Sequence, residues 1–296
     1  MADPEIAKLR ALIASRPRAT ELAQMRIDSD NRGKAFGLPA DVTVTPVIAN
    51  GVKAEWTSTP DADPDSVILY FHGGGYVICS LDSHRHLVAE CGRAAGARTF
   101  AVDYRLAPEH PFPAPVDDAV AAYRYLLDQG DQPNRIAFAG DSAGGGLVVG
   151  AMLAVKDAGL PQPACGWCIS PWVDMEAAGR SYDDRSATDP TVQRPTIQMM
   201  AGMYMNGADL KHPYASPVNG DLRGLPPLFI QVGSVETLLD DSFALARVAG
   251  IAEIPVALQV WPEMIHIWHI YFPMLNAGRR AIAAGGEFIK NVFKGA

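Results

Sequence analysis

Residues 135–154 read RIAFAGDSAGGGLVVGAMLA, an apolar run that ends at a glycine-rich pentapeptide and continues as a second apolar run. The first run is typical of a buried strand, and the second, from about Ala143, is typical of a helix. Between them, Gly140-Asp-Ser-Ala-Gly144 matches G-x-S-x-G, in which a serine sits on a sharp strand-to-helix turn. Small residues are needed on both sides of Ser142, because such a turn brings two backbone segments close together. The stretch therefore predicts a strand–turn–helix unit that presents Ser142 at the end of a sheet as a candidate nucleophile.

Apolar runs alternate with helix-like patterns along much of the chain. Strands are expected at 66–71, 98–103, 164–170, 227–232 and 256–261, and helices at 83–96 and 117–129. Strands that are apolar throughout and separated by helices are typical of a parallel sheet covered on both faces. Ahead of them, residues 42–48 and 52–56 alternate like antiparallel strands, and the Asn50-Gly51 pair between them is a hairpin signal. The pattern predicts an α/β protein with a mostly parallel sheet.

Two segments lie outside this alternation. Apolar residues recur at helical spacing from about residue 5, Arg16-Pro17 interrupts them, and a second short helix is expected from Thr20 to Met25. Residues 175–212 contain no convincing strand and include a methionine-rich helical stretch from Thr196 to Met205. An insertion on the side where strands end is a candidate lid. The same methionines would equally suit a helix that packs on the core.

The bulk composition argues against several classes of partner. The 296 residues carry a net charge of -8, with 48% hydrophobic and 20% charged residues, and lysines and arginines are scattered. Such a surface has no electrostatic attraction for nucleic acid or anionic membrane. No stretch approaches the roughly 20 apolar residues of a membrane helix, and Met1-Ala-Asp-Pro-Glu-Ile6 lacks the features of a secretory signal. We therefore expect a cytoplasmic protein that binds no nucleic acid and does not insert into membranes.

The four cysteines do not form a disulfide-dense framework. Cys165-Gly-Trp-Cys168 has the C-x-x-C spacing of redox and metal sites, but it lies inside an expected buried strand. A redox pair normally occupies a helix start, where the thiolate is stabilised. We expect these cysteines to be core residues.

A second glycine-rich motif, His72-Gly73-Gly74-Gly75, follows the expected strand at 66–71. The tetrahedral intermediate of ester hydrolysis carries a developing oxyanion that needs fixed hydrogen-bond donors. Consecutive glycines let bare backbone N–H groups turn toward such a point. The expected donors are Ala143, which follows the nucleophile, and two residues of the loop, of which Gly74 and Gly75 are favoured over Gly73. A phosphate-binding loop is the alternative, but that motif requires a lysine that is absent here.

Three motifs occur in a fixed order along the chain: His72-Gly-Gly-Gly75, Tyr104-Arg-Leu-Ala-Pro-Glu-His-Pro-Phe-Pro113 and Gly140-Asp-Ser-Ala-Gly144. Together they resemble the hormone-sensitive-lipase-like family of α/β-hydrolases, also called bacterial type IV esterases. The resemblance extends from about residue 40 to the C-terminus. It implies an α/β-hydrolase fold, with a mostly parallel eight-stranded sheet flanked by helices and a helical cap. On this division, residues 1–40 are N-terminal cap helices, and residues 41–296 are the catalytic domain with a cap insertion at about 175–212.

The acid of a Ser–acid–His triad should follow a late strand, because the chain order in this fold is serine, acid, histidine. Most members of the family that this chain resembles have D-P-L after the strand that corresponds to 227–232. This sequence has Glu236-Thr-Leu238 at that place. Glu236 is therefore the expected acid, and Asp240 is the alternative. A glutamate at this position would also suit a helix start, where it satisfies backbone N–H groups.

The base should follow the last strand, at 256–261. His266 comes next and fits the M-x-H-x pattern of the family, while His269 is its competitor. Two histidines at this spacing suggest a metal, but no third ligand stands at a sensible spacing, so no metal is expected. His266 would accept the proton of Ser142 and pass it to the leaving alcohol.

Other residues carry weaker expectations. His84 and His86 are expected at the surface or in local structure, and Asp82 and Ser83 resemble a helix N-cap region. Candidate walls of the substrate pocket, which could equally be core residues, are Trp172, Met199, Met203 and Tyr204.

These expectations together describe a serine carboxylesterase for short- to medium-chain acyl esters, acting through Ser142, Glu236 and His266 and an acyl-enzyme intermediate. Its partner would be a small-molecule ester, and no cofactor is implied. The family resemblance also implies that a homodimer is common. A lactone hydrolase would need the same triad. A ligand receptor on this fold would have lost the histidine, which is present here as His266, and a long-chain lipase is not expected.

Overall fold

The computed structural model describes residues 4–15 and 19–295. Within these residues, eight strands form one sheet in the order β1-β2-β4-β3-β5-β6-β7-β8. The β1–β2 and β2–β4 pairs are antiparallel, and every other neighbouring pair is parallel. This confirms the expected mostly parallel α/β sheet. The strands are β1 Thr43–Ala49, β2 Val52–Ser58, β3 Asp63–Phe71, β4 Ala97–Val102, β5 Ile136–Asp141, β6 Cys165–Ile169, β7 Leu228–Gly233 and β8 Val256–Trp261.

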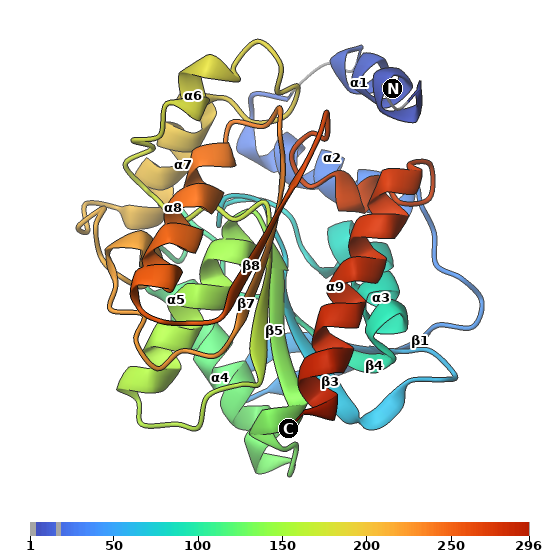
Figure 1. The fold of residues 1–296 in the computed structure, drawn as a ribbon. Coiled ribbons are helices and arrows are strands. Elements are labelled where there is room, and N and C mark those ends of the chain that lie inside the picture. Colours follow the sequence, from blue (N-terminus) through green and yellow to red (C-terminus); the bar gives the residue numbers. More distant parts are fainter. Residues whose placement is uncertain (1–3, 16–18, 296) are drawn as a thin grey trace.

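Helices cover both faces of the sheet (Figure 1). The α-helices of the described residues are α1 Pro4–Ala14, α2 Leu22–Lys34, α3 Leu81–Ala95, α4 Ala114–Asp128, α5 Ala143–Asp157, α6 Ser181–Asp184, α7 Arg194–Met205, α8 Leu239–Ile251 and α9 Asn276–Lys294. In Figure 1, α3 and α9 lie on one side of the strands, and α4, α5 and α8 on the other. Because successive side chains of a strand point to opposite faces, each central strand contributes to two separate cores.

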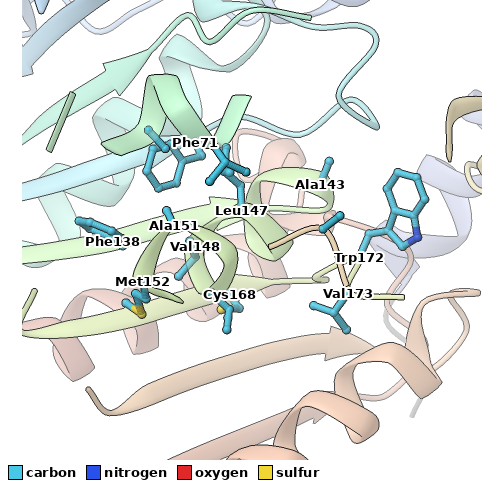
Figure 2. Close-up of a cluster of buried hydrophobic side chains, with 14 of the residues drawn as sticks. Phe71, Phe138, Ala143, Leu147, Val148, Ala151, Met152, Cys168, Trp172 and Val173 are labelled. Atoms are coloured by element: carbon cyan, nitrogen blue, oxygen red, sulfur yellow. The ribbon is translucent and has the colours of Figure 1, made fainter. Parts of the chain in front are cut away.

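The central strand β3 shows this division directly. Leu69 and Phe71 belong to the core under α4 and α5, whereas Ile68 and Tyr70 belong to the core under α3 and α9. Figure 2 shows the first of these cores, with Phe71 among side chains from β5 and α5. Burial of one such aromatic or aliphatic side chain stabilises the fold by roughly 1.5–3 kcal/mol. The continuous apolar runs of the sequence therefore reflect burial on two faces.

Helix α2 is longer than the sequence predicts, since it continues from the expected end at Met25 to Lys34. Its second half is polar and a poor helix former, but it packs on the start of α3. Gly33 lies so close to Ser83 that a Cβ atom would overlap the Ser83 backbone. Asp30 accepts a hydrogen bond from Ser80 Oγ at 2.7 Å. Tertiary packing therefore overrides weak propensity here.

The start of α3 also differs in detail from the expectation. The N-cap is Ser80, which forms a reciprocal capping box with Ser83, whereas Asp82 lies within the first turn. The N-cap therefore lies two to three residues before the expected Asp82 or Ser83. Ser80 accepts from the Asp82 N–H at 3.1 Å, which satisfies a donor that the helix itself leaves unpaired.

Residues 175–212 contain α6 and α7 and no strand, as expected. The predicted helix from Thr196 begins two residues earlier, at Arg194. The interruption expected at Arg16-Pro17 lies outside the described residues. Cys165 and Cys168 are buried, free thiols in β6, so the prediction of core cysteines is confirmed. Burial raises the pKa of the Cys165 thiol to about 12, which makes it unreactive at neutral pH.

Candidate active site

Ser142 has a left-handed backbone, with φ of 55° and ψ of -119°, at the junction of β5 and α5. A residue with a side chain is strained in this region, at a cost of about 1–3 kcal/mol. Three backbone hydrogen bonds hold it: Ser142 N–H donates to Ile169 O at 2.8 Å, and Ser142 O accepts from Trp172 at 2.9 Å and Gly146 at 3.1 Å. The strain is therefore maintained by the neighbouring strand β6 and by the first turn of α5.

The glycines of the pentapeptide have a steric reason. At Gly144, a Cβ atom would overlap the carbonyl oxygen of Phe71 and press on that of His72. At Gly140, a Cβ atom would press on the backbone of Gly144. The first turn of α5 therefore lies directly against the start of the His72–Gly75 loop.

The His72–Gly75 loop turns sharply through left-handed glycines. Gly74 and Gly75 have φ of 108° and 62°, and Gly74 O accepts from the N–H groups of Val77 and Ile78 at 3.0 Å. Among the described residues, no acceptor is found for the backbone N–H groups of Gly73, Gly74, Gly75 and Ala143. Four unpaired donors thus lie on two adjoining segments, which is the arrangement that binds a developing oxyanion.

His72 contacts both this loop and Tyr104. Its Nδ1 is 2.7 Å from Gly73 O, and its own carbonyl accepts from the Tyr104 hydroxyl at 2.7 Å. The imidazole stacks on Tyr104 with ring centroids 4.2 Å apart. Burial, helped by the nearby His84, lowers the pKa of His72 to about 3, so this ring is neutral and structural.

Glu236 and His266 form a buried pair that follows the two last strands. His266 Nδ1 lies 2.6 Å from Glu236 Oε2, and the glutamate side chain is fully buried. Burial opposes protonation of His266, but the hydrogen bond and charge of Glu236 outweigh it and raise the pKa of the ring. A proton on Nδ1 directed at Glu236 leaves Nε2 as the nitrogen free to accept one.

Ser170 connects this pair to the serine turn, and the sequence did not reveal it. Its hydroxyl donates to Glu236 Oε1 at 2.8 Å and accepts from Ile267 N–H at 3.2 Å. Ser170 directly follows Ile169, the residue that accepts the Ser142 N–H. Its position at the carboxyl end of the strand next to β5 was the available signal, because such ends meet at one edge of a parallel sheet.

No hydrogen bond between Ser142 Oγ and His266 occurs within the described part of the chain. Bonds of this kind are often long without substrate and tighten in the complex. The shared contacts of Ser170 nevertheless bring the serine turn and the Glu236–His266 pair to the same edge of the sheet.

The alternative acid and base have other partners. Asp240 accepts from Ser181 N–H at 2.9 Å and thereby holds the start of α6. His269 is fully buried, and its Nε2 lies 3.0 Å from Gln231 Oε1. Burial lowers the pKa of His269 to about 3. Glu236, and not Asp240, is therefore the carboxylate in contact with His266.

Residues 68–270 match a family described by its alpha/beta hydrolase fold. The chain belongs to this family. It is 47% identical over 296 residues to an acetyl-hydrolase of Streptomyces hygroscopicus, covering 98% of this chain and 97% of the relative. It is 33% identical over 233 residues to carboxylesterase NlhH of Mycobacterium tuberculosis, covering 76% of this chain and 73% of the relative.

The crystal structure of an esterase from the bacterial hormone-sensitive lipase family superposes with a TM-score of 0.96. The two chains are 45% identical, and the superposition covers 99% of each. The resemblance expected from the three motifs is therefore confirmed, and the protein is a carboxylic ester hydrolase. None of the helices in the described ranges is long and apolar enough to cross a membrane.

The buried histidines and carboxylates of this hydrolase do not amount to a metal centre, because no cluster of three or more potential ligands occurs in residues 4–15 and 19–295. His84 and His86 were expected at the surface or in local structure, and a surface position is wrong, since both are buried. The helix α3 turns this face toward the sheet. His84 Nε2 lies 3.2 Å from Asp141 Oδ2, and His86 donates to Ile270 O at 2.9 Å.

A cavity of about 540 Å³ lies between α2, α7 and the segment near Tyr271. Neither Ser142 nor His266 lines it, but Met200 does, and the Met200 sulfur fills the space where a Cβ of Gly75 would lie. Met200 therefore lies between the cavity and the His72–Gly75 loop. Its walls are Ile13, Ala19, Met25, Asp28, Asn31, Arg32, Ala35, Ile78, Pro190, Thr191, Thr196, Met200 and Tyr271.

None of the four side chains expected as pocket walls belongs to this set. Met199 is 42% exposed, and Met203 packs at the edge of the core. Tyr204 and Trp172 are fully buried, and Tyr204 stacks on Tyr76 with centroids 3.9 Å apart. The helical phase of α7 explains the difference, because it turns Met200 toward the loop and its neighbour Met199 toward solvent.

Arg26 of helix α2 binds two loops near the site, one after the His72–Gly75 segment and one after β4. Arg26 donates from Nε to Val77 O and from Nη2 to Ala107 O, both at 2.9 Å. The same guanidinium makes two 2.8 Å bonds to Glu109. One side chain therefore ties α2 to the loops that follow both β3 and β4.

The Glu236–His266 contact predicts a specific effect of Glu236→Gln. Loss of the negative charge should lower the pKa of His266, because the carboxylate is what raises it. We expect kcat to fall by about 10²–10⁴-fold and the acidic limb of the kcat/KM profile to move to lower pH. Stopped-flow or steady-state hydrolysis of a p-nitrophenyl ester across pH measures both.

Asp240→Asn is the matched control, since Asp240 is nearby in sequence but bonds to Ser181. It should leave kcat and the acidic limb close to those of the unmodified protein. An Asp240→Asn variant that lost as much activity as Glu236→Gln would refute the expectation that Glu236 is the carboxylate acting on His266.

Proposed function

We propose that the hydrolase is a serine carboxylesterase for short- to medium-chain acyl esters, with Ser142 as nucleophile, His266 as base and Glu236 as acid. The 2.6 Å hydrogen bond from His266 Nδ1 to the buried Glu236, at the sheet edge that holds the strained Ser142, is the observation that carries the proposal. A carboxylate in this place holds the imidazole in one tautomer and stabilises its protonated form.

The proposed reaction has two halves. Ser142 Oγ attacks the ester carbonyl while His266 Nε2 takes its proton, and the resulting oxyanion accepts from the N–H groups of Gly74, Gly75 and Ala143. Collapse of this intermediate expels the alcohol, which receives the proton from His266, and leaves the acyl group on Ser142. Water, deprotonated by His266, then attacks the acyl-enzyme. The second tetrahedral intermediate collapses by breaking the bond to Ser142 Oγ, which regains a proton from His266 as the carboxylic acid is released.

Gly73 is the remaining candidate donor. It lies against the Asp141 carboxylate, so closely that a Cβ atom there would overlap Asp141 Oδ2. A second negative charge bound at Gly73 would lie near this carboxylate and be repelled by it. The proposal therefore assigns the oxyanion to Gly74, Gly75 and Ala143.

The proposed cap consists of residues 1–40, as far as they are described, and residues 175–212. Helix α2 from the first segment and α7 from the second both line the 540 Å³ cavity. Met200, at the wall of this cavity, also contacts Gly75, so the two cap segments meet beside the His72–Gly75 loop. The 47% identity, over nearly its whole length, to a relative named as an acetyl-hydrolase supports the proposal of short acyl groups.

The first test is Ser142→Ala. We expect hydrolysis of p-nitrophenyl acetate to fall by about 10³-fold or more, because the covalent route is removed, while circular dichroism stays unchanged. The unmodified protein should also give kcat/KM values that are highest between acetate and hexanoate. Full activity of Ser142→Ala would overturn the mechanism, and a preference for a lactone such as γ-butyrolactone would overturn the substrate class.

The second test concerns Met200. Met200→Ala should open space beside Gly75 and raise kcat/KM for octanoate relative to acetate by several-fold, since each buried methylene contributes about 0.8 kcal/mol. The chain-length series of p-nitrophenyl esters measures the ratio. Met199→Ala is the control, because Met199 is 42% exposed on the same helix. An unchanged ratio in Met200→Ala, or an equal change in Met199→Ala, would contradict the proposal.

A further inference from the structure

Asp141, the residue before the nucleophile, carries a fully buried carboxylate that the proposed reaction does not use. Its Oδ1 accepts from the Tyr70 hydroxyl at 2.9 Å, and its Oδ2 lies 3.2 Å from His84 Nε2. The same Oδ2 lies against Gly73 of the oxyanion loop. One carboxylate therefore touches strand β3, helix α3 and the oxyanion loop, and its own backbone leads directly into Ser142.

His84 is held at both ring nitrogens. Its Nδ1 lies 2.7 Å from Ser83 Oγ, and that hydroxyl is also directed at Ser80 O at 2.7 Å. Ser83 Oγ accepts in turn from the Ser80 N–H at 2.9 Å, which fixes Ser83 at the start of α3. His84 Nε2 donates to the Asp141 carboxylate, because a carboxylate can only accept. The ring is therefore held between Ser83 and Asp141.

The contacts continue from His84 to helix α2. Ser80 Oγ donates to Asp30 of α2 at 2.7 Å, and Gly33 of α2 packs against the Ser83 backbone. A continuous series of polar contacts therefore runs from α2 through the start of α3 to the residue next to Ser142.

We infer that Asp141 and His84 are positioning residues, which fix the serine turn relative to the oxyanion loop and place a negative charge near His266. A buried charge that is not paired is strongly unfavourable, so a carboxylate at this position is retained only with its donors in place. The inference rests on the roles proposed above for Ser142 and His266.

Electrostatics agree with this placement. The charge of Asp141 is among the contributions that raise the pKa of His266, after those of Glu236 and Asp189. Two sets of titratable groups bear on the test. Those that act on His266 are Glu236, Asp189, Asp141 and His269. Those around Asp141 are Tyr70, His72, Cys79, His84, Cys91, Tyr104 and His269.

The test compares two buried histidines of α3. His84→Gln should lower kcat by about 10–100-fold, because a displaced nucleophile reacts slowly, with KM changed less than about threefold. His86→Gln removes a histidine two residues away that bonds to Ile270 O. It should lower thermal stability but retain kcat within about threefold of the unmodified protein.

Asp141→Asn supplies a readout that a purely structural role would not move. It should lower kcat in the same way and shift the acidic limb of kcat/KM to lower pH by about half a unit, because a negative charge near His266 is lost. Tyr70→Phe removes only one hydroxyl donor, so it tests the same site if Asp141→Asn folds poorly. It should give a smaller loss of kcat, with KM unchanged.

Two outcomes would overturn the inference. The first is unchanged kcat in both His84→Gln and Tyr70→Phe. The second is a loss of kcat in His86→Gln equal to that in His84→Gln. Ser142→Ala separates this failure from that of the proposed function. An active Ser142→Ala refutes the proposed function, whereas an inactive Ser142→Ala with fully active His84→Gln and Tyr70→Phe refutes only the positioning role.

Discussion

The left-handed backbone of Ser142 is the constraint on which the rest of the site depends. It persists because β6 supplies both an acceptor and a donor to Ser142, through Ile169 and the segment after it, and because α5 begins with glycines that allow close contact. The same contact places Ala143 beside the His72–Gly75 loop. A residue with a larger side chain at Gly144 would separate the two segments. The strained serine and the unpaired backbone donors are therefore consequences of one packing arrangement.

Two buried carboxylates, Glu236 and Asp141, are the negative charges around which the site is arranged. Glu236 accepts from Ser170, from the Gly233 backbone and from His266, while Asp141 accepts from Tyr70 and contacts His84. Burial of a charge is costly unless hydrogen bonds and opposite charge offset it. Each carboxylate therefore orders several segments at once. This explains how residues far apart in the sequence are held at one edge of the sheet.

The local parts of this arrangement could be predicted, and the tertiary parts could not. Continuous apolar strands, the serine turn and the glycine loop follow from short-range sterics and periodicity, so their positions were predicted to within a few residues. His84 carries no local signal, and Ser170 carries only its position at a strand end, because their roles come from neighbours 57 and 66 residues away in sequence. The contact of Met200 with Gly75 was not predicted for a similar reason. Only the orientation in which α7 packs on the protein distinguishes Met200 from the exposed Met199. The extension of α2 also depends on its contact with α3 and not on its own propensity.

The central claim is that Ser142 Oγ is the nucleophile and that the glycine loop binds the oxyanion. The most direct measurement is a crystal structure of the protein after reaction with an alkyl phosphonate ester that mimics the tetrahedral intermediate. The account predicts a covalent bond from phosphorus to Ser142 Oγ. It also predicts that the phosphoryl oxygen lies about 2.7–3.1 Å from the N–H groups of Gly74, Gly75 and Ala143. A phosphonate bound to another residue, or a phosphoryl oxygen that faces away from these donors, would contradict it.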